Sequence, residues 1–483
     1  MSDKAKNFST HFKYLILLII LLDVVYTFKQ NDGKPIDGDL VSIVLPTKNY
    51  AKVLEDPFGI SVLLKHEKYS GSNRYFCHEA MHIWFKDVEH VVAFFFKDKT
   101  TALYATSALF NTLVYLFFIV LFAAYASMKV AFKSKEFLVS MLIALPFMQI
   151  NGFDSIALID GAVTYTFFYG LALCVLLLYF FPFYIYFISK KTFSFLFIKH
   201  AIWILLAVYI SFGGTLNQPL ILYASAFFTG LFLLKNISQN KQKAIFKSVK
   251  VAVAEIPTFI KIHLSFLIIL CLYSYYIGMF NDENPMEMPS LYERYLLLLK
   301  GIGIHFTINI PYLLFLILLA ANYIVLKKIS INKQESAVLK FSKYLALFSL
   351  IYIAILPLGG YRNYRPFIIR YDIMSPINIL IIFYAIFTSW LIVKYNFNKK
   401  YAAFLGVLLF IFIISDKPDF HNNKCQKQKL RVFSTTNEDT IRIDKACMFF
   451  QWNTDRNDYN SPSISKMIYE WKISEKPVYF IQE

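Results

Sequence analysis

A series of long apolar segments, separated by lysine-rich loops, constrains this chain more than any other feature of its sequence. About 20 apolar residues cross the hydrocarbon core of a bilayer as a helix, and shorter segments suffice when polar caps are allowed. We therefore predict an all-α polytopic membrane protein. About eleven spans are expected, at residues 14–28, 104–126, 137–150, 162–188, 196–212, 219–234, 258–280, 306–326, 343–357, 374–393 and 401–415.

The lysines fall in alternate loops. The loops near residues 151–161 and 213–219 contain no Lys or Arg, whereas the loops between them are basic. Positive loops stay in the cytoplasm, so the N-terminus is expected inside and the C-terminus outside. The net charge of +17 then reflects membrane topology, and no nucleic-acid partner is expected. The lysines concerned are Lys129, Lys133, Lys135, Lys190, Lys191, Lys235, Lys241, Lys243, Lys247, Lys250, Lys327, Lys328, Lys333, Lys394, Lys399 and Lys400.

Two domains are predicted. Residues 1–415 form the transmembrane domain, including a long outer loop at residues 29–100, and residues 416–483 form a small extracytoplasmic α+β tail. Runs of Val, Ile and Phe predict short tail strands, at Leu430–Ser434, Thr440–Ile443 and Val478–Ile481. An oxidising compartment would permit a disulfide between Cys425 and Cys447.

Two interfacial helices are expected on the outer side. From Glu79 to Phe96, apolar residues recur at helical spacing, which predicts an amphipathic helix in the plane of the membrane surface. A second is predicted at Ser290–Ile304.

Acidic motifs occupy the outer loop. Asp37-Gly38-Asp39 can supply a general base or hold a divalent cation, Mg²⁺ or Mn²⁺, and can equally be a polar turn. Glu55-Asp56-Pro57-Phe58-Gly59 is interpreted as a structural turn in which Asp56 caps a helix or assists Asp39.

The same loop contains a literal H-E-x-x-H sequence, His78-Glu79-Ala80-Met81-His82. On a helix this spacing can bind zinc, with the glutamate as base. No third ligand follows at a familiar spacing, and Arg74 lies nearby. We therefore interpret Arg74, His78 and His82 as substrate-contacting residues and expect no metal there.

Three arginines, Arg362, Arg365 and Arg370, lie on the outer side, against the charge rule that the other loops follow. Guanidinium groups bind phosphate bidentately, which suits a lipid phosphate. The alternative is a salt bridge between Arg370 and Asp372, or snorkelling. Polar residues at the outer ends of spans can line a sugar site or cap helices; these are Asn151, Asp154, Asp160, Tyr165, Asn217 and Gln218.

This layout resembles the GT-C superfamily of polytopic glycosyltransferases. Asp37-Gly38-Asp39 stands where that family keeps its acidic motif, and Gly161-Ala162-Val163-Thr164-Tyr165 is similar to a segment of bacterial members that modify surface polysaccharides. The resemblance covers roughly residues 10–415.

The resemblance implies a bacterial inner-membrane enzyme that moves a sugar from a polyprenyl-phosphate donor to a glycan or lipid acceptor. Asp39 or Asp37 would deprotonate the acceptor, and the three arginines would bind the donor phosphate. Asp56, Arg74, His78, His82, Tyr165 and Asn217 would contact substrate. Mg²⁺ or Mn²⁺ could assist, and no other cofactor is expected. The alternatives are a surface-polysaccharide polymerase or ligase, a lipid or solute transporter, and a zinc peptidase.

Overall fold

The computed structural model describes residues 3–46, 48–189, 197–239, 250, 253–254, 256–284, 287–307, 309–362, 365–452 and 461–483. Several residues of the predicted loops lie outside the described residues, namely Lys190, Lys191, Lys241, Lys243, Lys247, Asn363 and Tyr364. The remainder is mostly helical, so the predicted all-α class of membrane protein is confirmed.

Within the described part of the chain, seven helical segments are long and apolar enough to cross a membrane. They are Thr10–Asp32 in α1 (Asp3–Asp32), α7 (Lys99–Ser127), α9 (Val163–Tyr165) with η4 (Thr166–Leu171) and α10 (Ala172–Ser189), α12 (Asn217–Gln239), α14 (Thr258–Gly278), α17 (Lys333–Ile355) with η5 (Leu356–Gly359), and α18 (Tyr371–Tyr395). An eighth crossing is possible if α15 (Leu291–Thr307) and α16 (Ile310–Leu326), bent by 71°, act as one span.

All eleven predicted segments contain helix, but three give helices shorter than the seven. They are α8 (Lys135–Ala144) followed by η2 (Leu145–Met148), α11 (Phe197–Phe212) and α19 (Lys399–Ser415). A ten-residue helix such as α8 rises only about 15 Å, half of the hydrocarbon thickness of about 30 Å. Length and composition therefore support seven or eight crossings, and the count of eleven stays a prediction.

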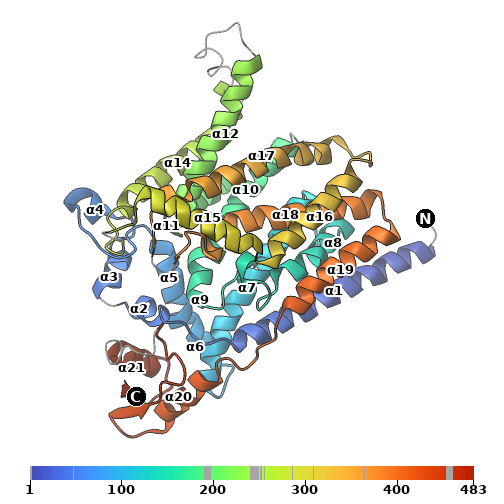
Figure 1. Cartoon of the computed structure of the whole chain (residues 1–483). Coiled ribbons are helices and arrows are strands. Elements are labelled where there is room, and N and C mark those ends of the chain that lie inside the picture. Colours follow the sequence, from blue (N-terminus) through green and yellow to red (C-terminus); the bar gives the residue numbers. More distant parts are fainter. Residues whose placement is uncertain are drawn as a thin grey trace.

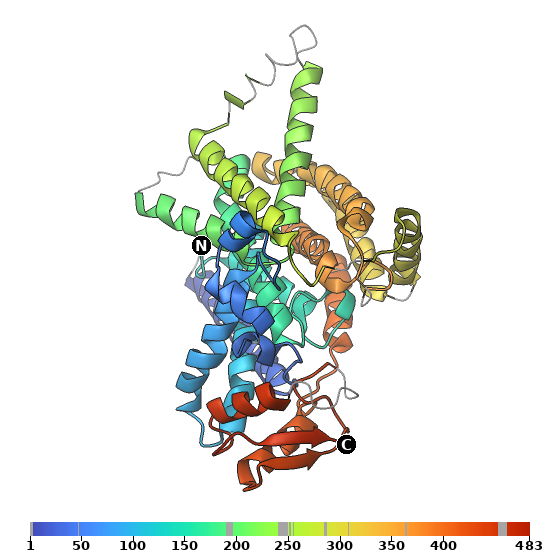
Figure 2. The ribbon, with the colours of Figure 1, turned by 90° about the vertical axis from the view of Figure 1, so that its left-hand side faces the viewer.

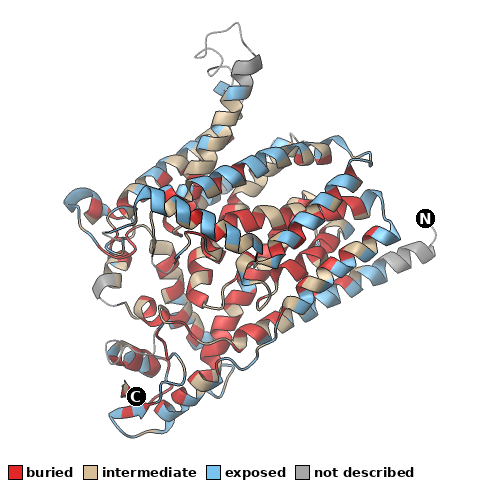
Figure 3. Ribbon diagram, viewed as in Figure 1, coloured by how far each residue is buried: buried red, intermediate tan, exposed pale blue. Residues whose placement is uncertain are grey.

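α7 and α18 form the centre of the helical bundle. The apolar window of α7 is 72% buried inside the molecule and that of α18 is 78% buried. The corresponding value is 17% for α1 and for the α17 segment, whose residues are mostly exposed or intermediate (Figure 3). Small residues in α7, including Ala105, Ala108 and Ala124, allow neighbouring helices to approach closely. α1 and α8 pack against α7 and thereby fix the loops at their ends.

The first loop, residues 33–98, lies at one end of the bundle (Figure 1). Its elements are α2 (Leu40–Val44), α3 (Lys48–Glu55), α4 (Ile60–Lys65), α5 (Tyr75–Ile83), η1 (Trp84–Val88) and α6 (Glu89–Ala93). The predicted helix at 79–96 is confirmed as the continuous run α5–η1–α6, which buries Met81 and Phe85 and exposes Phe94 and Phe95 beyond its end. The second predicted interfacial helix corresponds to α15.

The tail, residues 416–483, lies at the same end as the first loop (Figures 1 and 2). It contains α20 (Lys424–Thr435), β1 (Thr440–Ile443), α21 (Ser461–Glu470) and β2 (Tyr479–Gln482). β1 and β2 pair in parallel, with Thr440 opposite Tyr479. The predicted α+β tail and the Cys425–Cys447 disulfide are confirmed.

The predicted strand at Leu430–Ser434 is wrong, because these residues belong to α20. Gln426, Leu430 and Phe433 are buried together, and their spacing of four and three positions is that of one helical face. A short apolar run does not by itself distinguish a strand from a buried helix face.

Candidate functional site

Asp37, in the first loop, is buried against the start of the segment that runs from α9 into α10. Its carboxylate accepts hydrogen bonds from the Thr164 backbone N–H (3.0 Å), the Thr164 hydroxyl (2.7 Å) and the Asp39 backbone N–H (3.1 Å). Burial raises the pKa of Asp37 to about 6, although the bonds from Thr164 act to lower it. Asp37 thus joins the acidic motif to the segment that opens with Gly161-Ala162-Val163-Thr164-Tyr165.

Asp39 is only half-buried and has a different partner. It occupies the residue before α2 but makes no side-chain cap to that helix. Instead, its carboxylate accepts a hydrogen bond of 2.7 Å from the indole Nε1–H of Trp452 in the tail. Burial raises the pKa of Asp39, and the bond from Trp452 acts in the opposite direction.

Arg365 and Arg370 converge on Asp372 at the start of α18. Asp372 is 1% exposed, and the Nη2 of Arg365 and the Nε of Arg370 lie 2.6 and 3.4 Å from its carboxylate oxygens. The salt bridge between Arg370 and Asp372, weighed as an alternative from the sequence, is therefore present. The shorter contact makes Arg365 the main partner of Asp372.

Two tyrosine rings flank the guanidinium group of Arg370. Its centre lies 4.9 Å from the ring of Tyr165 and 5.0 Å from the ring of Tyr371, and the Tyr371 hydroxyl bonds the carboxylate of Asp160. Arg370 lies close enough to Asp39 and Asp160 to lower the pKa of each, although burial is the larger effect and raises both. Residues from three distant segments thus form one carboxylate–arginine cluster, made of Asp37, Asp39, Asp160, Arg365, Arg370 and Asp372.

A second group of residues surrounds Glu283, which lies in the loop after α14. The negative charge of Glu283 acts to raise the pKa of Asp39. The carboxylate of Glu283 accepts a hydrogen bond from the Tyr50 hydroxyl (2.7 Å) and forms an ion pair with Arg74 (3.2 Å). Arg362 donates a hydrogen bond to the backbone carbonyl of Glu283. Burial acts to raise the pKa of Glu283, but Arg74 and Tyr50 outweigh it and the net pKa is lowered. The three predicted arginines therefore divide between two neighbouring groups.

The two histidines of the H-E-x-x-H sequence have separate partners. His78 is 2% exposed and stacks on Tyr50, and burial, with the nearby Arg74 cation, lowers its pKa to about 3. The Nδ1 of His82 lies 2.8 Å from the backbone carbonyl of Val44. Among the residues that the structure describes, no group of three or more His, Cys, Asp or Glu side chains is arranged to hold a metal ion.

The acidic motif does not fit a divalent cation as a pair of ligands. The carboxylate of Asp37 already accepts three hydrogen bonds, which leaves Asp39 as the carboxylate with room for a further partner. Hard cations such as Mg²⁺ prefer several oxygen ligands. Asp37 and Asp39 therefore do not provide the set of oxygen ligands that such a cation needs.

Asp56 and Asn217 are held by local contacts instead. Asp56 accepts bonds from the backbone N–H groups of Ile60 and Ser61 at the start of α4, so the predicted capping role is confirmed. The amide of Asn217 donates to the carbonyls of Ala172 and Ile210 and is fully buried. In the described part of the chain, no contact joins either residue to the carboxylate–arginine cluster.

Sequence reasoning missed Trp452, Glu283 and Tyr50. Glu283 belongs to the polar stretch Asn281-Asp282-Glu283-Asn284, whose position after a span was a usable signal. Trp452 and Tyr50 carry no such signal, because their importance depends on contacts between distant segments.

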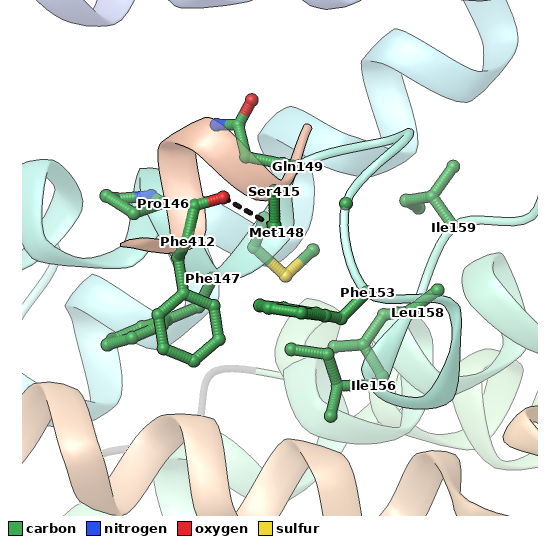
Figure 4. Close-up of a pocket in the computed structure, with 12 residues that line it drawn as sticks. Pro146, Phe147, Met148, Gln149, Phe153, Ile156, Leu158, Ile159, Phe412 and Ser415 are labelled. Atoms are coloured by element: carbon green, nitrogen blue, oxygen red, sulfur yellow. Dashed lines mark hydrogen bonds between the residues drawn. The ribbon is translucent and has the colours of Figure 1, made fainter. Parts of the chain in front are cut away.

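A small pocket lies apart from these groups, between η2, the loop at residues 149–159 and the end of α19 (Figure 4). Phe147, Met148, Phe153 and Phe412 line it together with Gln149 and Ser415, and Ser415 bonds back to the carbonyl of Phe412 (2.8 Å). None of its lining residues belongs to the carboxylate–arginine cluster.

The fold defines the class of the protein as a multi-pass membrane protein. No protein-family model matches the chain, and no curated protein is similar to it at a significant level.

Proposed function

We propose that this protein is a membrane glycosyltransferase. It would move a sugar from a polyprenyl-phosphate donor to a cell-envelope glycan or lipid acceptor, on the extracytoplasmic face of the bacterial inner membrane. The observation that carries the proposal is the carboxylate–arginine cluster, in which a half-exposed acid lies within electrostatic reach of a guanidinium group that contacts two tyrosine rings.

Asp39 is the better of the two candidate bases. Asp37 is buried and accepts two hydrogen bonds from Thr164, whereas the carboxylate of Asp39 has one side-chain hydrogen-bond partner among the described residues, Trp452. A general base must reach the proton that it removes. Asp39 therefore takes the proton, and Asp37 holds the acidic motif against Thr164.

Arg370 is the better candidate for the donor phosphate. Asp372 keeps its 2.6 Å contact with Arg365, so the 3.4 Å contact from Arg370 can be exchanged without leaving a buried carboxylate unpaired. Tyr165 and Tyr371 hold the guanidinium plane, and an arginine group has donors enough for a bidentate phosphate contact.

The reaction is a substitution at the anomeric carbon of the sugar. The acceptor hydroxyl oxygen forms the new bond to this carbon while its proton passes to Asp39. The bond between the anomeric carbon and the phosphate oxygen breaks, and its electron pair leaves with the polyprenyl phosphate. Arg370 stabilises the negative charge that develops on this leaving group.

The first test is ligand-dependent thermal stability of the detergent-purified protein. Polyprenyl phosphate should raise the melting temperature, because a ligand at a hundredfold excess over its dissociation constant stabilises the folded state by about 2.7 kcal/mol. The uncharged polyprenol should have a much smaller effect.

The matched variants are Arg370→Gln and Arg442→Gln. Arg442 is an exposed arginine of β1 in the tail. Its ion-pair partner, Glu483, does not belong to the carboxylate–arginine cluster. Arg370→Gln should remove the shift caused by the phosphate, and Arg442→Gln should keep it. Equal shifts in both variants, or no shift in the parent protein, would argue against the proposed donor site.

A further inference from the structure

The tail is seated directly on the glycine of the acidic motif. A Cβ atom added at Gly38 would lie 2.5 Å from the backbone nitrogen of Trp452 and 2.7 Å from the backbone carbon of Gln451. Backbone atoms cannot swing away as a side chain can, so only glycine permits this approach. Gly38 is therefore required by a contact with the tail and not only by the local turn.

Two further tail residues hold the chain just before the motif. The side-chain amide of Gln426 accepts from the backbone N–H of Ile36 (2.8 Å) and donates to its carbonyl (3.1 Å). Asn423 donates to the carbonyl of Gly33 through its backbone (2.9 Å). The tail thus binds the backbone on the N-terminal side of Asp37 as well as at Gly38.

At Asp39 the tail contacts a functional side chain directly, through a hydrogen bond. An aspartate at the start of a helix usually accepts from the backbone N–H groups of the first turn. Asp39 makes no such bond, and its carboxylate accepts from Trp452 instead. The Trp452 side chain is 48% exposed and its ring lies 5.9 Å from that of Tyr165, which in turn flanks Arg370.

We infer that the tail is part of the functional site and that Trp452 is a positioning residue, which orients the Asp39 carboxylate and favours its ionised form. The catalytic meaning of this inference rests on the proposed function, whereas the contact between Trp452 and Asp39 does not.

In addition to the neutral indole of Trp452, several charged or titratable groups face Asp39. Glu283 opposes its ionisation and Arg370 favours it, Asp39 in turn raises the pKa of Asp37, and the phenols of Tyr50 and Tyr165 lie within electrostatic reach. Removal of the indole N–H should therefore leave the effects of burial and of Glu283 on the Asp39 carboxylate less opposed. The pKa of Asp39 should rise.

The test is ¹⁹F NMR of the full-length protein labelled with 5-fluorotryptophan, in detergent and without substrate. Among the five tryptophans Trp452 alone is exposed, so its resonance is identified by the largest solvent isotope shift and by its loss in Trp452→Phe. We expect this resonance to titrate with a midpoint above 3.8, the ordinary pKa of an aspartate. In Asp39→Asn the same resonance should not titrate.

A Trp452 resonance that does not titrate, or one that titrates equally in Asp39→Asn, would overturn the inference. The largest solvent isotope shift identifies the Trp452 resonance without the Trp452→Phe variant, so the wild-type and Asp39→Asn spectra still decide the inference if Trp452→Phe does not fold. A positive titration together with failure of the polyprenyl-phosphate test would leave the contact standing and remove the proposed function.

Trp471→Phe provides a matched control for activity. Trp471 is also a tail tryptophan whose indole N–H bonds the first loop, at the carbonyl of Phe85 (3.0 Å), away from Asp39. Trp452→Phe should move the acid midpoint of sugar transfer to higher pH, and Trp471→Phe should not move it. Equal shifts in both variants would show a general bracing role of the tail and overturn the specific role of Trp452.

Discussion

Asp37 and Asp39 are separated by one glycine, yet they have different surroundings. Asp37 is surrounded by donors from Thr164, and Asp39 faces Arg370 and the tail. Because neighbouring residues in an irregular segment point in different directions, an acidic pair in a sequence need not act as a pair. The two carboxylates can therefore be tested separately.

Asp39→Asn should lower sugar transfer by about 10² to 10⁴-fold, the usual contribution of a general base. In the parent protein, activity should fall as Asp39 becomes protonated at low pH, with a midpoint above 3.8 because burial raises its pKa. The measurement is transfer of labelled sugar in membrane preparations. Asp87→Asn, an exposed carboxylate of the same loop, is the control, and a fully active Asp39→Asn protein would exclude this base.

Asp37 should give the molecule a pH-dependent stability. Its pKa rises from 3.8 to about 6 on folding, so its contribution is fully present below pH 3.8 and is lost as the pH rises through 6. Two units of pKa correspond to roughly 3 kcal/mol. Asp37→Asn cannot ionise, so its unfolding free energy relative to the parent should increase by up to this amount between pH 4 and pH 7. A difference that is constant with pH would contradict the burial of Asp37.

At the scale of elements, the tail packs on the first loop through a specific backbone contact, in which Gly38 lies against Gln451 and Trp452. Gly38→Ala should destabilise the protein by about 1–3 kcal/mol, the usual cost of overpacking, because the new methyl group meets the backbone of Gln451 and Trp452. Gly406→Ala in α19 is the control, since a Cβ there meets nothing within 4 Å. Chemical denaturation measures both, and equal stability of the two variants would argue against a tight seat.

The disulfide stabilises the tail on which this contact depends. Cys425 and Cys447 are 22 positions apart, and closing a loop of this size stabilises a fold by about 3 kcal/mol in the chain-entropy description. Reduction, or the Cys425→Ser/Cys447→Ser pair, should therefore make the tail more sensitive to limited proteolysis. The fragment that ends near residue 415 should accumulate first. Cleavage that begins between α7 and α8 instead would show that the tail is not the weaker element.

At the scale of the whole molecule, the charge pattern and the structure make a joint prediction about orientation. The first loop and the tail lie at one end of the bundle, and this end should face outward because the lysine-rich loops stay in the cytoplasm (Figure 1). A membrane-impermeant maleimide should label Ser434→Cys in intact cells and should label Ser134→Cys only after lysis. The reverse pattern would place the first loop and the tail in the cytoplasm. It would therefore argue against the proposed sugar transfer on the extracytoplasmic face.

Local features were predictable from the sequence, and long-range ones were not. Apolar length and helical periodicity are properties of neighbouring residues, so the helices of the apolar segments, the amphipathic segment of the first loop and β1 were predicted correctly, whereas the start of the tail was not. The proximity of the acidic motif to Arg370 could be expected from charges on one side of a membrane. The partners of each group, such as Asp372 for Arg365 and Trp452 for Asp39, depend on packing that no local pattern encodes.

The contact between the tail and the acidic motif also has a consequence for biosynthesis. Ile36 and Asp39 are held by residues 390 and 413 positions later in the chain. At a synthesis rate of about 5–20 residues per second, roughly 20 to 80 s separate the appearance of the motif from that of its partners. The acidic motif therefore reaches this geometry only after residues 423–452 have been made and folded, and a nascent chain that stops before Trp452 lacks the contact that orients Asp39.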